Sequence, residues 1–415
     1  MRDFDNSLLR SISKERNVPI VEFLLNTFYN QLGDPITILG VSPISKHIVK
    51  GALLAAKECD APMMFIASLN QIDYDGGYTG WTPKSFTKFL ENEVKRLGIV
   101  SPIILALDHG GPWLKDLHIQ RGYSFEEALE STYKSIESAI IAGYDVIHID
   151  TTVDLYTNDL STEIVAKRTL DLLEFAEDVR KNYDISLINY EIGSDRWRFK
   201  DEDHASELVS LVLKGLKRRS LDKVRIIFMV GDVGTKVAPG NLLDVEKAKK
   251  LVDVASRYGL YLKTHSTDYV GNPEVFPKIG IGGANIGPMF ADIEYRVMKD
   301  LAIKEKDFYE KGKLRKHSNI LESLYSYILE DGRWRKYSKI EPTKLEVDKR
   351  ELIMGLCSRY VWSKMDSRIN EMFKNLSKMG IDAESLIVKE LKEVIVKYLK
   401  SFNLCSINKR FKKIL

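Results

Sequence analysis

Several features that would place a protein in a class at once are missing from this 415-residue sequence. Its three cysteines, Cys59, Cys357 and Cys405, lie far apart and form no CxxC pair, so we expect neither a disulfide framework nor a zinc knuckle. The N-terminus has no apolar signal-peptide core, and no apolar run approaches the length of a transmembrane helix. We therefore expect a cytoplasmic protein that does not enter a membrane.

An excess of charge of one sign is missing as well. Lys and Arg number 62 and Asp and Glu number 59, and the resulting net charge of +3 is too balanced to indicate a nucleic-acid-binding protein. Hydrophobic residues make up 44% of the chain and charged residues 29%, which is typical of globular proteins. The chain is long enough for one large domain with an appendage.

What the sequence does contain is a regular alternation of short apolar runs with helical patterns. The runs are mostly β-branched and apolar on both faces, as expected of buried parallel strands, and cover residues 36–41, 63–67, 103–107, 146–149, 185–188, 224–230, 260–262 and 279–286. Helical patterns lie between them at 46–59, 83–97, 124–143, 161–182, 203–219 and 243–258. Ser124 and Glu127 have the spacing of a capping box at one helix start.

Eight strands alternating with helices over roughly 250 residues are typical of a TIM barrel. We predict a TIM (β/α)8 barrel over residues 35–300, a helical lead-in over 1–34, and a C-terminal helical extension over 301–415. An open doubly wound sheet is the structural alternative, but the first strand–helix turn lacks the GxGxxG of a Rossmann domain. The glycine-rich stretch 76–81 lacks the Lys-Ser/Thr of a P-loop, which favours a flexible active-site flap.

Side chains that bind metals or move protons follow several of the predicted strands. A barrel gathers these strand ends around one pocket. We therefore predict a divalent-metal site formed by His109, His265 and Glu191, with Asp232 as an optional fourth ligand and zinc or manganese as the ion. Asp108 is placed to shuttle a proton beside this site, although a loop-capping role explains it nearly as well.

Other strand-end residues are candidates for substrate binding. His148 and Asp150 are two residues apart on one strand and point the same way. We interpret His148 as a hydrogen-bonded residue inside the barrel and Asp150 as a contact for substrate hydroxyls. The turns after the seventh and eighth strands are the usual phosphate site of this fold. The candidates there are Ser266, Thr267, Asn285 and Gly287, although a tight turn alone explains the glycine.

A set of motifs in chain order carries a family resemblance. They are Asn70-Gln71, Gly76-Gly-Tyr-Thr-Gly80-x-Thr-Pro83, Asp108-His109-x-Gly-Pro112, Ala142-Gly, Ile147-His-Ile-Asp150, His265-Ser-Thr-Asp-Tyr269, Ile286-Gly-Pro288, Arg359-Tyr-Val-Trp362 and Ser367-Arg-Ile-Asn370. Across roughly residues 36–376 the sequence resembles the tagatose-bisphosphate aldolase Z-type subunit family. The resemblance implies a class II aldolase-like TIM barrel with C-terminal helices.

The resemblance also implies roles for individual residues. Asp108-His109 matches the pair that class II aldolases use for proton transfer and metal binding, and His265 matches a later metal histidine. Glu191-Ile-Gly resembles the Glu-Leu-Gly of the aldolases, whose carboxylate lies beside the metal. One departure stands out, because Gly231-Asp232 is found where the aldolases have another metal histidine.

The same motifs suggest where the rest of a sugar phosphate would bind. Asn70 and Gln71 begin the first motif and are candidates for substrate binding. The guanidinium forks of Arg359 and Arg368 suit a distal phosphate, with surface salt bridges as the alternative.

Three functions remain open from the sequence. The first is a metal-dependent enzyme, a lyase or 4-epimerase acting on tagatose or fructose phosphates by retro-aldol chemistry, with Zn²⁺ before Mn²⁺ as the cofactor. The second is a non-catalytic subunit that stabilises a separate catalytic aldolase subunit, which is how the Z-type family is described. The third is a homo-oligomer, assembled through its helices, that acts on another sugar or sugar acid.

Overall fold

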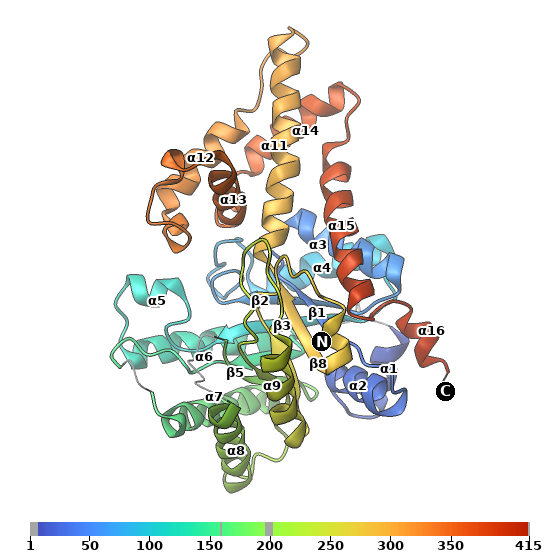
Figure 1. Cartoon of the computed structure of the whole chain (residues 1–415), viewed down its shortest axis with the longest axis vertical. Helices are drawn as coiled ribbons and strands as arrows, with labels where there is room; N and C mark the ends of the chain where they lie inside the picture. Colours follow the sequence, from blue (N-terminus) through green and yellow to red (C-terminus); the bar gives the residue numbers. More distant parts are fainter. Residues whose placement is uncertain (1–6, 158–159, 196–201, 414–415) are drawn as a thin grey trace.

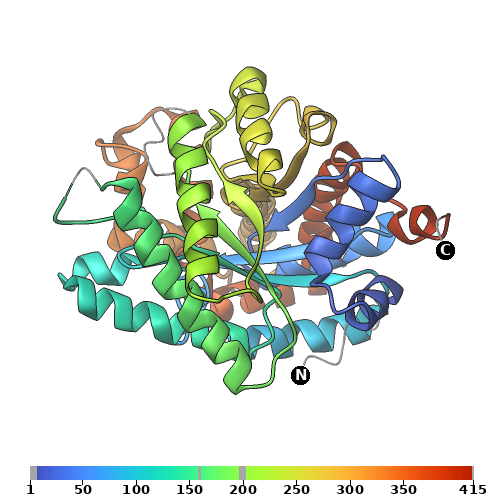
Figure 2. The same cartoon turned by 90° about the horizontal axis from the view of Figure 1, so that it is seen from below.

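The computed structural model describes residues 7–157, 160–195 and 202–413. Its centre is a closed barrel of eight parallel strands in sequential order, which Figure 1 shows from the side and Figure 2 from below. The strands are β1 (Ile38–Val41), β2 (Met63–Ser68), β3 (Ile103–Gly110), β4 (Val146–Ile149), β5 (Asn189–Gly193), β6 (Arg225–Val230), β7 (Tyr261–Thr264) and β8 (Ile281–Ile286). The predicted TIM barrel is confirmed, and the open sheet is excluded.

One predicted strand is wrong in position. The apolar run 185–188 precedes the sheet, and β5 begins at Asn189. Asn189 and Glu191 are polar and fully buried, and both have partners on other elements. The side-chain oxygen of Asn189 accepts from the Glu22 backbone N–H, and Glu191 pairs with Lys263 on β7. Buried polar pairs of this kind remove the continuous apolar signal by which an interior strand is recognised.

Helices surround the barrel, and several of them begin after a Ser, Thr or Asp whose side chain caps the first turn. The helices before and around the barrel are α1 (Leu8–Glu15), α2 (Ile20–Asn26), α3 (Lys46–Cys59), α4 (Pro83–Leu97), α5 (Asp116–Gln120), α6 (Phe125–Ile141), α7 (Thr162–Asn182), α8 (Glu202–Arg218), α9 (Val245–Arg257) and α10 (Val275–Ile279). The Ser124–Glu127 capping box forms as predicted, with the Ser124 hydroxyl accepting from the Glu127 N–H and the Glu127 carboxylate accepting from the Ser124 N–H. None of the helices in the described ranges is both long and apolar enough to span a bilayer.

The C-terminal extension is helical, and its first helix continues directly from the last strand of the barrel. It consists of α11 (Pro288–Glu310), α12 (Ile320–Asp331), α13 (Val347–Ser358), α14 (Asp366–Lys378), α15 (Ala383–Ser401) and α16 (Ile407–Phe411). Helix α11 leaves β8 without a linker and continues through residue 300, rising above the barrel in Figure 1. Helix α15 returns along α3, and the chain ends beside the N-terminal helices.

The glycine-rich stretch 76–81 contacts this extension. Ser363 donates a hydrogen bond to the Tyr78 carbonyl oxygen at 2.7 Å, and the Tyr78 ring packs edge-on against Tyr360 with ring centroids 5.1 Å apart. The Arg333 guanidinium lies over the same Tyr78 ring. These contacts hold the stretch in place, which differs from the flexible flap that we predicted from its glycines.

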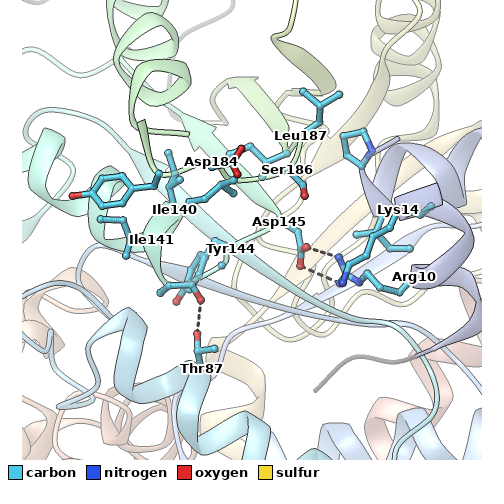
Figure 3. A pocket seen from close by; sticks show the side chains of 18 of the residues that line it. Arg10, Lys14, Thr87, Ile140, Ile141, Tyr144, Asp145, Asp184, Ser186 and Leu187 are labelled. Atoms are coloured by element: carbon cyan, nitrogen blue, oxygen red, sulfur yellow. Dashed lines mark hydrogen bonds and ion pairs between the residues drawn. The ribbon is translucent and has the colours of Figure 1, made fainter. Parts of the chain in front are cut away.

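A cavity lies at the opposite end of the barrel from the strand-end residues. Its volume is about 650 Å³, and its lining includes the segments 143–145 and 185–188, which lead into β4 and β5 (Figure 3). The Arg10–Asp145 ion pair, 2.5 Å between Nη1 and Oδ1, lies in its wall. In TIM barrels the N-terminal ends of the strands serve stability, so size alone does not mark the functional site.

Candidate functional site

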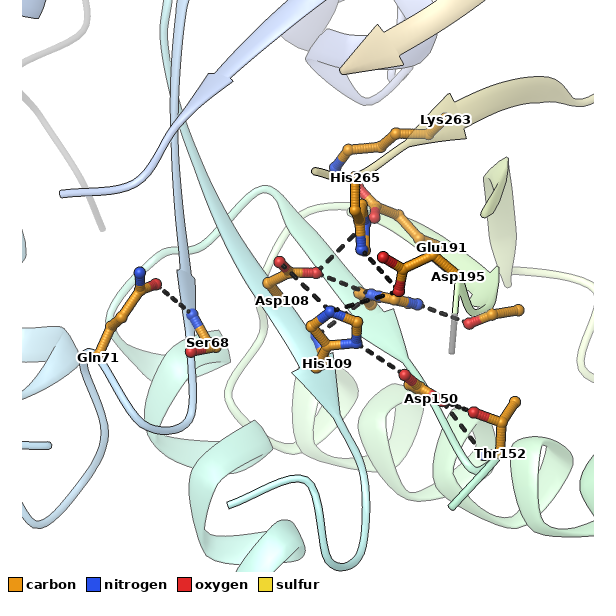
Figure 4. A network of polar contacts seen from close by, with 12 residues as sticks. Ser68, Gln71, Asp108, His109, Asp150, Thr152, Glu191, Asp195, Lys263 and His265 are labelled. Carbon is orange, nitrogen blue, oxygen red and sulfur yellow. Dashed lines mark hydrogen bonds and ion pairs between the residues drawn. The ribbon is translucent and has the colours of Figure 1, made fainter. Parts of the chain in front are cut away.

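The site begins with an irregularity in strand β3. The pairing of β3 with β4 shifts by one residue between Leu107 and Gly110, which is the mark of a β-bulge. His109, inside the bulge, has a φ of 51°, in the left-handed region. In a regular strand neighbouring side chains point to opposite faces, whereas here both Asp108 and His109 turn toward His265 at the mouth of the barrel (Figure 4).

His109 is held by Asp150, which ends β4. Its Nδ1 lies 2.7 Å from Asp150 Oδ2, while Asp150 Oδ1 accepts from the Thr152 hydroxyl at 2.6 Å. Burial opposes ionisation of Asp150, but the hydrogen bond and charge of His109 prevail and lower its pKa to about 2. A carboxylate bound to one ring nitrogen orients the other nitrogen toward a metal. Asp150 therefore positions His109, and the structure shows no free oxygen on it for a substrate hydroxyl.

His148 lies beneath Asp108 and is completely buried. Its Nε2 donates to the Gly193 carbonyl oxygen at 2.8 Å, and its Nδ1 lies 3.0 Å from Asp108 Oδ1. Burial disfavours the charged ring, but the carboxylates of Asp108, Glu191 and Asp150 outweigh it and raise the pKa of His148 to about 9. Burial likewise opposes ionisation of Asp108, yet the surrounding histidines hold the pKa of Asp108 well below its usual range.

His265, directly after β7, is the point where the contacts converge. Its Nε2 lies 3.5 Å from Asp108 Oδ1, and its Nδ1 lies 3.6 Å from Asp195 Oδ1. Both ring nitrogens are buried and have no hydrogen-bond partner among the residues that the structure describes. An unsatisfied buried polar group costs about 1–3 kcal/mol, so a native structure that keeps two of them calls for a functional reason.

Two groups of ligand atoms share His265. Asp108 with His148 forms one group with it, His109 with Asp195 forms the other, and within each group the ligand atoms lie within 4.8 Å of one another. Asp195 was not predicted. Asp195 lies two residues after the end of β5, but no feature of the sequence distinguished it from its neighbours.

Below this layer lies an ion pair that was also missed. Lys263 Nζ is 2.5 Å from Glu191 Oε1, and both side chains have no exposed surface. Glu191 Oε2 has no hydrogen-bond partner. One oxygen of the predicted ligand Glu191 is therefore committed to Lys263, and the other remains available. A lysine within an otherwise apolar strand was the signal for this pair.

Asp232 does not join the group in the part of the chain that the structure describes. Its Oδ2 binds Lys247 Nζ at 2.7 Å, its Oδ1 accepts from the Gly234 N–H at 2.8 Å, and its side chain is 46% exposed. The loop after β6 places this carboxylate as a turn-capping residue on the surface. It is not arranged as the fourth ligand that we predicted.

The predicted substrate contacts on the loop after β2 are engaged in holding that loop. The Asn70 amide donates to the Leu114 carbonyl at 3.0 Å and accepts from the Asp116 N–H at 2.8 Å. Gln71 accepts from the Ser68 N–H at 2.8 Å. These bonds give both residues a structural role in the described structure.

The predicted phosphate site is also occupied by the chain itself. The backbone N–H of Gly287 donates to the carboxylate of Asp268, Thr267 bonds to Thr264 and to the Asn285 carbonyl, and the Ser266 carbonyl accepts from Asn241. The side-chain amide of Asn285 is buried, and neither its nitrogen nor its oxygen has a hydrogen bond to the residues described.

The two arginines predicted to hold a distal phosphate lie in the extension, and their hydrogen bonds are to other residues of the extension. Arg359 donates to the Leu356 carbonyl at 2.5 Å and to the hydroxyls of Tyr337 and Tyr360 at 2.6 Å. Arg368 donates to the Ser318 carbonyl at 3.1 Å. Arg359 is buried and already rich in partners, so its contacts are those of a structural cation.

The fold and the site place the protein in the class of (β/α)8-barrel proteins with carboxylate and imidazole side chains gathered at the strand ends. The family described as D-tagatose-1,6-bisphosphate aldolase subunit GatZ/KbaZ-like matches residues 26–403, and the chain belongs to this family. The resemblance noted in the sequence is thereby confirmed.

Individual relatives are distant. The D-tagatose-1,6-bisphosphate aldolase subunit GatZ of Escherichia coli O1:K1 / APEC is 24% identical over 261 residues, which cover 58% of this chain and 60% of that protein. The GatZ subunit of Shigella flexneri is 23% identical over 379 residues, covering 85% of this chain and 87% of that one. The chain thus spans about 60% of the length of the first of these relatives.

Solved structures share the fold. A probable tagatose 6 phosphate kinase from Sinorhizobium meliloti 1021 superposes with a TM-score of 0.73 at 21% identity, covering 88% of this chain and all of that one. A fructuronate-tagaturonate epimerase, UxaE from Cohnella laeviribosi, superposes with a TM-score of 0.55 at 13% identity, covering 89% and 81%. At these identities the likeness establishes the fold alone.

Proposed function

We propose that this chain is a metal-dependent, class II aldolase-like enzyme of ketose-phosphate metabolism that acts on tagatose or fructose phosphates by retro-aldol chemistry, as a lyase or a 4-epimerase. The observation that supports this most is His265, whose two buried nitrogens face two carboxylates and have no hydrogen-bond partner in the described part of the chain. Family membership supports the sugar class.

The residues at the strand ends fit a divalent cation, Zn²⁺ first and Mn²⁺ second. His109, His265 and Asp195 provide two imidazole nitrogens and a carboxylate within 4.8 Å of one another, a donor set that suits either ion. Such an ion, when bound, would polarise the carbonyl and hydroxyl oxygens of a ketose. His109 is oriented for this role by Asp150.

Asp108 is the group that we assign to proton transfer. The neighbouring histidines keep it ionised, and His148 fixes one of its oxygens at 3.0 Å. Asp108 accepts the proton of the C4 hydroxyl as the C3–C4 bond breaks, which yields an aldehyde and an enediolate. For epimerisation the aldehyde turns over, the bond re-forms on its other face, and Asp108 returns the proton to the new hydroxyl.

A non-catalytic subunit is the second candidate. Two observations favour it: the relatives are named as subunits of an aldolase, and Asp232 does not complete the metal group. In this case the chain would bind and stabilise a separate catalytic aldolase subunit. Self-association into a homo-oligomer stays a prediction, and light scattering of the purified protein tests it.

The experiment begins with the protein purified alone. Its bound metal is measured, and it is then incubated with Zn²⁺ or Mn²⁺ and tagatose or fructose phosphates. Release of triose phosphate supports a lyase, and interconversion of the two ketoses supports an epimerase. The absence of metal and turnover, together with activation of a separate aldolase subunit, would overturn the enzyme proposal in favour of the second candidate.

Two variants and one control test the site itself. We expect His109→Ala to abolish metal binding, and Asp108→Asn to retain the metal while losing at least about 100-fold in kcat, the usual contribution of a general base. Asp232→Asn is the matched control, because this carboxylate lies outside the group, and both metal content and kcat should stay unchanged. If Asp108→Asn turned over at the wild-type rate, the assignment of the base would be wrong.

A further inference from the structure

The start of helix α11 presents two backbone N–H donors, those of Gly287 and Met289. The helix is 23 residues long and follows β8 with only Gly287 between them. Both N–H groups donate to one atom, Asp268 Oδ1, at 3.2 Å from Gly287 and 2.7 Å from Met289. Asp268 is 1% exposed. The anion at this helix terminus is thus part of the protein.

The loop that carries Asp268 is fixed on both sides. The Asn241 side chain donates to the carbonyl oxygens of Ser266 at 3.0 Å and of Asp268 at 2.8 Å, and the Thr267 N–H donates to the Asn285 carbonyl at 3.1 Å. These bonds fix the backbone that carries Asp268, and the N–H groups of Gly287 and Met289 hold its carboxylate. Its position at the helix terminus is therefore a property of the folded loop.

The position of Asp268 determines which substrates can bind at these loops. In (β/α)8 barrels the loops after the seventh and eighth strands, with a helix N-terminus, bind the phosphate of a phosphorylated substrate. Here the same donors are taken, and a phosphate brought to them would meet a buried carboxylate of the same charge. Two like charges about 4 Å apart repel strongly in a partly buried setting. Arg359, the nearby cation, is satisfied by Tyr337 and Tyr360.

We propose that Asp268 is a specificity-determining residue that closes the phosphate seat at the β7 and β8 loops, so that the substrate end reaching these loops carries a hydroxyl in place of a phosphate. The inference rests on the proposed function and narrows its substrate class. The chain takes a ketose phosphorylated at one end only, and a second phosphate weakens its binding.

The first test changes the seat and uses inorganic phosphate as the probe. In Asp268→Ser the two N–H donors are freed and the negative charge is gone, and we expect calorimetry to show phosphate binding at least ten-fold tighter than in the wild type. Asp382→Ser is the matched control, because Asp382 also caps a helix, α15, but on the exposed surface of the extension. Equal phosphate affinity in wild type and Asp268→Ser would overturn the proposal.

The second test needs only the wild-type protein and remains decisive if Asp268→Ser fails to fold. Binding of fructose and tagatose 1-phosphates, 6-phosphates and 1,6-bisphosphates to the metal-loaded protein is compared by calorimetry. Because one phosphate of a bisphosphate must face the Asp268 carboxylate, we expect each bisphosphate to bind at least ten-fold more weakly than the better monophosphate. A bisphosphate that binds within two-fold of the better monophosphate, or more tightly than it, would overturn the closed seat. If no ketose phosphate binds at all while Asp268→Ser gains phosphate, the proposed function fails and the closed seat stands.

Discussion

At the scale of single residues, the site depends on how each buried polar atom is satisfied. Asp150 orients His109, His148 fixes Asp108, and both nitrogens of His265 lack a hydrogen bond to any described residue. The identities of Asp108, His109 and His265 could be predicted because they end apolar strands. Asp195 could not be chosen over its neighbours, because its relevance depends on a distance to His265 across the barrel.

His118, a histidine outside the site, allows a test of how one buried hydrogen bond contributes to the stability of the fold. His118 is buried, and its Nδ1 accepts the Trp113 N–H at 3.1 Å, which requires a neutral ring. Burial and the nearby Lys115 lower the pKa of His118 to about 4. Because the folded pKa lies below the unfolded value of about 6.5, this residue contributes stability above pH 6.5 that is lost as the pH falls toward 4.

We therefore predict that His118→Asn, which keeps an acceptor for Trp113 but does not titrate, reduces the sensitivity of the fold to acid. The drop in melting temperature between pH 7 and pH 4.5 should be smaller than in the wild type by about 1–2 °C. Calorimetric scans at both pH values measure it. Parallel pH profiles for the two proteins would contradict the assigned role of His118.

At the scale of elements, the bulge in β3 is what turns two consecutive residues to one side. Sequence patterns indicate the strand and its polar end, but not a one-residue shift in pairing or the positive φ of His109. The strand β5 was misplaced for a related reason, since Asn189 and Glu191 are buried polar residues with partners on other elements. Contacts between distant elements decide both features.

The loop after this bulge passes very close to β4 at Gly111. A Cβ on Gly111 would lie 1.6 Å from the Asp150 carbonyl oxygen, so a methyl group there must displace the residue that orients His109. We predict that Gly111→Ala weakens divalent-metal binding by about 10–100-fold, the range seen when a ligand loses its orienting partner. Metal titration by calorimetry measures the change.

Gly122→Ala is the control for this variant. Gly122 has a φ of +63°, so alanine costs stability there, but nothing lies within 4 Å of the added carbon. Its metal affinity should equal that of the wild type. If both alanine variants weakened metal binding to the same degree, general destabilisation would replace the local explanation.

At the scale of the whole molecule, the C-terminal extension is joined to the barrel through α11, which continues from β8, and through α15, which packs on α3. Helix α15 packs on α3 so closely that a Cβ on Gly51 would lie 3.0 Å from the Leu391 Cβ. After α15 the Phe402 carbonyl accepts from the Thr37 N–H, and Arg410 pairs with Asp34. The sequence predicted these helices but not their partner, because an apolar face does not say what covers it.

This packing predicts that the extension stabilises the barrel as part of one cooperative unit. Leu391→Ala, at a fully buried position of α15, should lower the free energy of unfolding by about 2–5 kcal/mol. Leu386→Ala, on the same helix but 41% exposed, should change it by less than about 0.5 kcal/mol. Urea titrations followed by circular dichroism compare them, and equal shifts for the two variants would show that α15 does not stabilise the fold through this face.

The contact between α3 and α15 also bears on the order in which the fold is completed during synthesis. Residues 46–59 are made before residues 383–401, so the face of α3 that packs on α15 lacks this cover until α15 has been synthesised. Residues after α15 then contact the segment before β1, where the Thr37 N–H donates to the Phe402 carbonyl and Arg410 pairs with Asp34. We therefore expect nascent chains that stall before residue 383 to expose this apolar face of α3 to chaperones.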